Sequence, residues 1–351
     1  MTEERVEWCP TWNDRVFGAI PLPPIFVAAG LTLTLWILFL ATVYATGDLA
    51  EFARTETRWW QERDARLAVL LALLAAYMPA ARRYEELGSR RNLEALRTSI
   101  SWGPGQFEAA SREIRQVDSR SRRVAGLLAL LVIPVTAFLV DRDPSLYLQK
   151  RYWDAAHFWM YGLAGAFCWN GGLLVYAIST HTRCFSRMAR GIPEVDLLNL
   201  GAFRPFMRQA SLSALPGVVV LSFLALNLAD QGFLWAIGIL GSVALTWTTV
   251  SLLFPMRGVR ERIREEKKVE IARVNAAIRG DETALGDSAI GARSEDPTLG
   301  ELLAYRAFVQ SVPEWLLDTP MRARFFLYVA IPLGSWLGGA LVERLLDTVL
   351  S

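Results

Sequence analysis

The segment 25–46, IFVAAGLTLTLWILFLATVYAT, contains no Asp, Glu, Lys or Arg and decides the fold class of this chain. The hydrocarbon core of a bilayer is about 30 Å thick, and a helix of roughly 20 apolar residues crosses it. Two further segments of the same kind lie at 158–179 and 233–254. The sequence therefore predicts an all-α, polytopic transmembrane protein.

Composition agrees with this prediction. Hydrophobic residues make up 53% of the 351, and the 21% that are charged are bunched between the apolar segments. Membrane helices require such charge-free runs, because a charged side chain is costly inside the hydrocarbon. The three cysteines, Cys9, Cys168 and Cys184, lie far apart without a CxxC pair. This spacing predicts neither a disulfide framework nor a zinc site.

Four shorter apolar segments bring the expected number of spans to about seven. The predicted spans are 25–46, 67–81, 124–140, 158–179, 212–229, 233–254 and 325–342. Segments 67–81 and 124–140 are short, and Pro134 interrupts the second, because proline lacks the backbone donor that a helix needs. Each of these two can be a tilted span, a half-span or a buried helix.

The distribution of basic residues predicts the orientation in the membrane. Arg and Lys are concentrated in 82–123, 181–208 and 257–324, and cytoplasmic segments carry an excess of these residues. The N-terminus is therefore expected inside and the C-terminus outside. Most basic residues are Arg, and Ala, Leu and Gly are abundant, which is typical of GC-rich bacterial genomes. We expect a multi-pass protein of the bacterial inner (plasma) membrane.

The expected organisation alternates membrane helices with sizeable cytoplasmic parts. Segment 82–123 has apolar residues at helical spacing on both sides of a Gly- and Pro-containing turn, which predicts a helical hairpin. The predicted parts are an interfacial segment 1–24, a main transmembrane domain 25–254 with hairpin 82–123 and loop 180–211, a cytoplasmic helical hairpin 255–324, and a final transmembrane helix and tail 325–351.

Motifs for catalysis and metal binding are absent from the sequence. It has no GxxxxGK[ST], HExxH, GxSxG or SxxK motif, so we expect no enzyme, no catalytic residue and no cofactor. His157 and His181 flank the fourth span at opposite membrane faces, so we interpret both as interfacial histidines that cannot share a metal. Asp141 and Asp143 form a weak metal motif and are expected in a solvated outer loop. A nucleic-acid partner is not expected, because no binding module is present.

The predicted spans contain neutral polar residues and no ionisable ones. Proton-coupled carriers usually need a charge in the membrane, so coupled transport is disfavoured. Asn170, Thr246 and Thr249 are candidates either for lining a pore in a symmetric assembly or for hydrogen bonds between helices. Gly334 and Gly338 form a GxxxG motif, which favours close helix packing within one chain or between copies.

Basic residues next to the spans have two interpretations. Arg82 and Arg83 stand at the expected cytoplasmic approach, where positive charge favours anions. The clusters 112–123 and 257–264 are expected to determine orientation, and contact with anionic lipid headgroups is the alternative interpretation.

These features lead to three hypotheses on function. The first is a homo-oligomeric membrane protein that acts as a channel-like pore or effector gated through its cytoplasmic helices. The second is a membrane scaffold or sensor subunit whose cytoplasmic hairpins dock another protein. The third is an enzyme or carrier for a lipid-linked substrate. Besides its own copies and a cytoplasmic protein, the expected partner is the lipid bilayer.

Overall fold

A computed structural model provides the structure of the chain. It describes residues 12–20, 22–46, 63–100, 102, 105–115, 119–141, 155–192, 195–225, 234–286, 288, 290–291 and 297–315. Every secondary-structure element within these ranges is a helix, which confirms the predicted all-α class for the described part of the chain.

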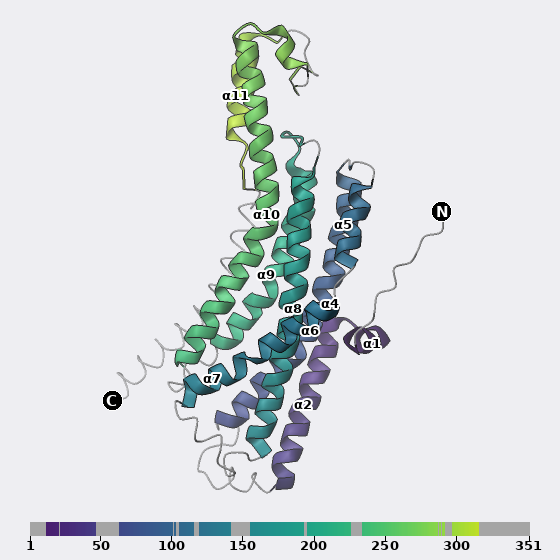
Figure 1. Ribbon diagram of the computed structural model, residues 1–351, viewed down its shortest axis with the longest axis vertical. Coiled ribbons are helices and arrows are strands. Elements are labelled where there is room, and N and C mark those ends of the chain that lie inside the picture. The colour runs from purple at the N-terminus through teal and green to yellow at the C-terminus, as the bar shows by residue number, and fades with distance from the viewer. Residues whose placement is uncertain are drawn as a thin grey trace, which may run out of the picture.

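The helices of the single chain form an elongated bundle (Figure 1). The α-helices are α1 (Trp12–Ala19), α2 (Pro24–Thr46), α4 (Arg63–Ser99), α5 (Gln106–Arg115), α6 (Ser119–Leu130), α7 (Val132–Asp141), α8 (Ala155–Arg190), α9 (Arg204–Ala225), α10 (Leu234–Ile278) and α11 (Leu299–Ser311). Two 3-10 turns, η4 (Leu200–Phe203) and η6 (Glu282–Leu285), precede α9 and follow α10.

Five of these helices are long and apolar enough to cross a membrane, which supports the prediction of a membrane protein. The candidate spans are Pro24–Thr46, Leu67–Ser99, His157–Arg190, Leu200–Leu224, which joins η4 to α9, and Gly238–Ile278. The short predicted segment 67–81 is thus part of a long helix. Segment 325–342 lies outside the described residues, and the count of seven spans stays a prediction.

The predicted segment 124–140 is divided between two short helices. α6 ends at Leu130 and α7 begins at Val132, so neither reaches the length of a span. Pro134 explains the position of this break, because its ring clashes with the carbonyl group four residues earlier, at Leu130.

Three helices continue far beyond their apolar segments. α4, α8 and α10 are 37, 36 and 45 residues long. α10 is therefore about 68 Å long, roughly twice the thickness of the hydrocarbon core. We call residues 24–46, 67–81, 157–179, 212–225 and 234–254 the apolar region. We call residues 82–99, 180–190, 204–211 and 255–278 the charged extension.

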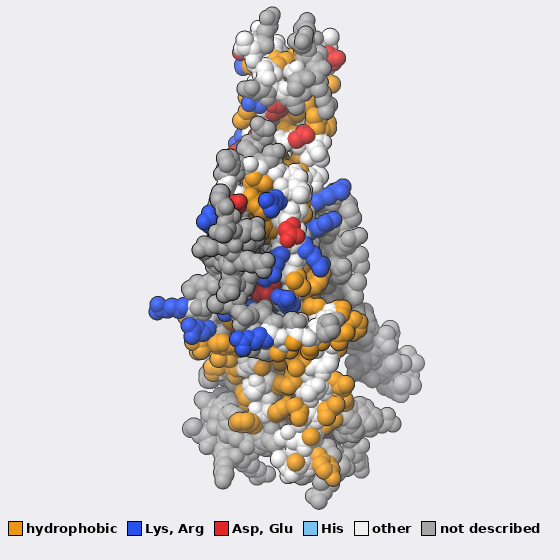
Figure 2. Space-filling view, turned by 90° about the vertical axis from the view of Figure 1, so that its right-hand side faces the viewer, with side chains coloured by type: hydrophobic (Ala, Val, Ile, Leu, Met, Phe, Trp, Pro, Cys, Tyr) orange, Lys and Arg blue, Asp and Glu red, His pale blue; other side chains and the backbone are white. Residues whose placement is uncertain are grey.

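The two regions bury different side chains. In the apolar region large hydrophobic side chains such as Phe158 and Val243 point outward. In the charged extension they point inward, and the largest hydrophobic core includes Leu96, Phe185 and Met256. Figure 2 shows this division on one face, with hydrophobic side chains dominating below and Lys and Arg gathered directly above them. The charged extension is thus packed like a water-soluble helical bundle.

Candidate functional site

A buried polar network lies where α4 leaves the apolar region. Glu85, Ser89 and Asn92 follow one another at helical spacing, so their side chains share one face of α4. All three are buried. This face meets α8 and α9, both of which pack against α4. The network therefore connects three helices from distant parts of the sequence.

Glu85 is the centre of the network. Its carboxylate accepts hydrogen bonds from His181 Nδ1 at 2.8 Å, from Ser89 Oγ at 3.0 Å and from Gln209 Nε2 at 3.1 Å. These donors come from α8, α4 and α9. A buried carboxylate needs this number of donors, because each unsatisfied oxygen costs the free energy of its lost hydration.

Gln209 extends the network towards the end of α4. Its Oε1 accepts a hydrogen bond from Asn92 Nδ2 at 3.1 Å, and its Nε2 also donates to Ser213 Oγ at 3.1 Å. Gln209 is fully buried, as are Glu85 and Ser89. The amide oxygen and the amide nitrogen of Gln209 thus both bond to α4. These two bonds fix the position of α9 along the axis of α4.

Burying an ionisable pair costs free energy of hydration, and burying apolar side chains does not. Removing a carboxylate and an imidazolium from water costs several kcal/mol per ion, and their mutual attraction often only offsets this cost. A network that specifies one arrangement of the helices is a better explanation for Glu85 and His181 than stability alone.

His181 is buried within the protein, and its position at a membrane face stays a prediction. Its side chain is 2% exposed, because α8 continues past the predicted span and α4 and α9 pack over it. The sequence analysis placed Glu85 in the predicted hairpin 82–123 without singling it out. The pattern that indicates Glu85 is a row of polar residues, Glu85, Ser89 and Asn92, beside the apolar residues Leu93 and Leu96; this row does not indicate His181.

The sequence-predicted polar residues of the spans lie in different environments. Asn170 is buried, and its Nδ2 donates to the Ala166 carbonyl oxygen of its own helix at 2.8 Å. Thr246 and Thr249 are exposed on α10, where Thr249 Oγ1 donates to the Leu245 carbonyl oxygen at 2.9 Å. The structure therefore does not bring Asn170 and the two threonines onto one surface.

The remaining predicted site residues are placed as follows. Arg82 is buried and forms an ion pair with Glu86 at 2.9 Å, so its charge is compensated within α4. Arg83, its neighbour, is half-buried. Gly334 and Gly338 lie outside the described residues.

A second polar cluster joins α11 to the far end of α10. Glu270 Oε1 accepts hydrogen bonds from Tyr305 Oη at 2.9 Å and from Ser288 Oγ, and Arg273 lies 3.3 Å from the other carboxylate oxygen. No group of three His, Cys, Asp or Glu side chains that could hold a metal ion occurs among the described residues.

Two exposed carboxylates cap the short elements near this cluster. Hydrogen bonds from Thr283 hold the pKa of Asp281 below its usual value at the start of η6. Hydrogen bonds from Thr298 lower the pKa of Glu301 in the same way. Thr298 and Glu301 form a capping box, which satisfies free backbone donors at the start of α11.

No known protein family, no curated protein and no solved structure matches this chain.

Proposed function

We propose that this chain is a homo-oligomeric protein of the bacterial inner membrane that acts as a channel-like pore or membrane effector gated through its cytoplasmic helices. The observation that carries the proposal is the buried network of Glu85, His181 and Gln209, at the level where continuous helices pass from the apolar region into the charged extension. With the N-terminus inside, the charged extension lies in the cytoplasm.

The continuity of the helices supplies the means of coupling. α4, α8 and α10 have no break between the apolar region and the charged extension. α8, which contains no proline, passes a displacement of its cytoplasmic end directly to its membrane segment, whereas Pro79 in α4 and Pro255 in α10 each remove one backbone hydrogen bond near the boundary. Buried hydrogen-bonded groups have discrete arrangements, and such two-state elements convert small shifts into a switch. We assign this switching role to Glu85 and His181.

The exposed threonines of α10 are the pore candidates. Thr246 and Thr249 present hydroxyl groups on the outer surface of one subunit, whereas Asn170 is buried inside it. In a symmetric assembly, α10 would face the central axis with this surface. Neutral hydroxyl groups there would conduct ions without an ionisable side chain.

Flux measurements in vesicles of defined size test the proposal. The purified chain is expected to be oligomeric and to conduct ions after reconstitution. Glu85→Gln should change the flux several-fold while the assembly keeps its mass, because the buried network loses the carboxylate of Glu85. Glu94→Gln is the control, since Glu94 is exposed on the same helix. Thr246→Leu combined with Thr249→Leu should reduce the flux.

The matched control for the threonines is Thr34→Leu. Thr34 is also exposed, and its hydroxyl donates to the Gly30 carbonyl oxygen in the same way. A monomeric wild-type protein, or no flux from the wild type and from Glu85→Gln, would contradict the proposed pore.

A scaffold or sensor subunit is the second candidate. It is favoured by the exposed apolar side chains Leu299, Leu303 and Phe308 on α11, far from the apolar region. A protein partner would bury these side chains in the cytoplasm. Loss of a co-purifying cytoplasmic protein in Leu303→Glu, together with an absence of flux from the wild type, would support this alternative over the pore.

A further inference from the structure

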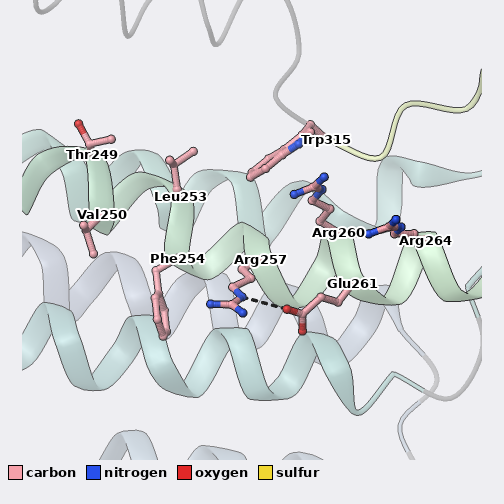
Figure 3. A pocket seen from close by; sticks show the side chains of 9 residues that line it. All are labelled: Thr249, Val250, Leu253, Phe254, Arg257, Arg260, Glu261, Arg264 and Trp315. Atoms are coloured by element: carbon pink, nitrogen blue, oxygen red, sulfur yellow. Dashed lines mark hydrogen bonds and ion pairs between the residues drawn. The ribbon is translucent and has the colours of Figure 1, made fainter. Parts of the chain in front are cut away.

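An open cleft of about 470 Å³ runs along α10, where the apolar region meets the charged extension (Figure 3). Val250, Leu253 and Phe254 line its apolar end, and Arg257, Arg260 and Arg264 line its basic end. The two ends follow one another along a single helix. The cleft therefore changes from apolar to basic in the direction in which the helix leaves the membrane.

Trp315 forms one edge of the cleft. Figure 3 shows its indole between Leu253 and Arg260, and the Arg260 guanidinium lies 4.7 Å from the centre of the indole ring. Glu314 Oε2 is 3.7 Å from Arg260 Nε. A cation over an aromatic face is attracted to it, so Trp315 holds this guanidinium beside the cleft.

The other edge carries an ion pair, and the cleft as a whole stays basic. Arg257 Nε lies 2.9 Å from Glu261 Oε1, drawn as a dashed line in Figure 3, and Arg190 Nε lies 3.8 Å from Glu261 Oε2. Arg264 is exposed and forms no ion pair with a described residue. Arginines therefore outnumber carboxylates around the cleft, which favours an anionic ligand.

The spacing along α10 places the arginines at different depths. From Leu253 the helix rises about 6 Å to Arg257 and about 10 Å to Arg260. The polar layer of a bilayer is roughly 5–8 Å thick on each side. If Leu253 marks the edge of the hydrocarbon, Arg257 lies within the polar layer and Val250 lies beside acyl chains. Arg260 begins just beyond this layer, and its side chain tilts back towards the phosphates because helical side chains lean towards the N-terminus. A dissolved anion would use only the basic end.

We propose that this cleft binds an anionic glycerophospholipid. Arg257 and Arg260 contact its phosphate, because guanidinium groups match phosphate oxygens with paired hydrogen bonds. Arg264 adds positive charge above the headgroup, and an acyl chain lies along Val250 and Leu253. This site is independent of the proposed channel function, because a scaffold or an effector can hold the same lipid.

Lipid retention by the full-length protein in neutral detergent tests this site. Native mass spectrometry compares phosphatidylglycerol with phosphatidylcholine carrying the same acyl chains. We expect a several-fold preference for phosphatidylglycerol. Each basic group near a membrane surface contributes on the order of a fivefold change in affinity. Arg264→Gln should lower phosphatidylglycerol affinity by roughly this factor and leave phosphatidylcholine unaffected, whereas Arg260→Gln, which removes a phosphate contact, should weaken the binding of both lipids.

Two controls separate the site from general charge effects and from misfolding. Arg279→Gln removes one exposed arginine beyond the end of α10, outside the cleft, and should leave lipid affinity unchanged. If Arg260→Gln loses folded structure along with its contact to Trp315, Arg264→Gln carries the test alone.

Three results would overturn the proposal. The first is equal retention of both lipids by the wild-type protein. The second is unchanged phosphatidylglycerol affinity in Arg264→Gln. The third is displacement of the lipid by inorganic phosphate at the same concentration, because a soluble anion would then account for the site without an acyl chain.

Discussion

At the scale of single residues, Glu85 is the centre of the buried network. It is fully buried and accepts hydrogen bonds from three helices through His181, Ser89 and Gln209. Its loss removes the acceptor that these three buried donors share, and Gln209 Nε2 keeps only Ser213 Oγ. Buried donors without acceptors are costly, so the network has no inexpensive intermediate between intact and broken.

Glu85→Ala should therefore destabilise the protein strongly. Breaking a buried ion pair by removing one partner typically costs about 3–5 kcal/mol. Glu94→Ala, at an exposed position on the same helix, should change stability by less than about 0.5 kcal/mol. Chemical unfolding in detergent, followed by circular dichroism, measures both. Equal effects of the two substitutions would show that the network does not stabilise the fold.

At the scale of helices, close crossings depend on glycines. A Cβ atom on Gly258 of α10 would collide with the backbone carbonyl oxygen of Ser186 on α8. A Cβ atom on Gly172 of α8 would lie 2.5 Å from the carbonyl oxygen of Ala125 on α6. Backbone atoms cannot yield as a flexible side chain does, so these two crossings require glycine.

Gly258→Ala should separate α8 from α10 and lower stability by about 1–3 kcal/mol, the usual range for overpacking. The control is Gly162→Ala on α8, because a Cβ atom there meets nothing within 4 Å. Alanine favours the helix by up to about 1 kcal/mol, so this control should be neutral or stabilising. Thermal unfolding compares the two variants. A stable Gly258→Ala protein would contradict the close crossing.

The sequence predicted the helices better than their packing. Segments such as 25–46 are unambiguous, because their length and lack of charge have one explanation in a bilayer. Pro134 makes the helix break at Leu131 predictable from the sequence. The contact between Gly258 and Ser186 cannot be predicted from the sequence, because a glycine contributes no apolar pattern that indicates its neighbour. The partners of Glu85 are 96 and 124 residues away along the chain.

At the scale of the whole molecule, the charged extension is the feature that hydropathy alone describes poorly. A hydropathy window shows where apolar segments end, but a helix can continue past that point, as α4 does through Arg82. The core around Phe185 then forms from residues that the sequence analysis assigned to a loop, 180–211. The apolar region and the charged extension consequently share the same helices.

The orientation of this molecule gives the last prediction, and it determines on which side any trigger must act. Single cysteines are introduced into a variant in which the three natural cysteines are replaced by alanine. Cysteines at Glu56 and Asp143, in segments predicted to lie outside, should react with a membrane-impermeant maleimide added to intact cells. A cysteine at Gly286, exposed at the end of the charged extension beyond α10, should react only after the membrane is opened.

The reason is the concentration of arginine and lysine on the helices of the charged extension, which opposes their transfer across a membrane. If the cysteine at position 286 were labelled in intact cells, the molecule would have the opposite orientation in the membrane. The network around Glu85 would then face the outside, and a cytoplasmic trigger could not act on it directly. Labelling of Glu56 with protection of Asp143 would instead mean that an odd number of spans separates these two positions.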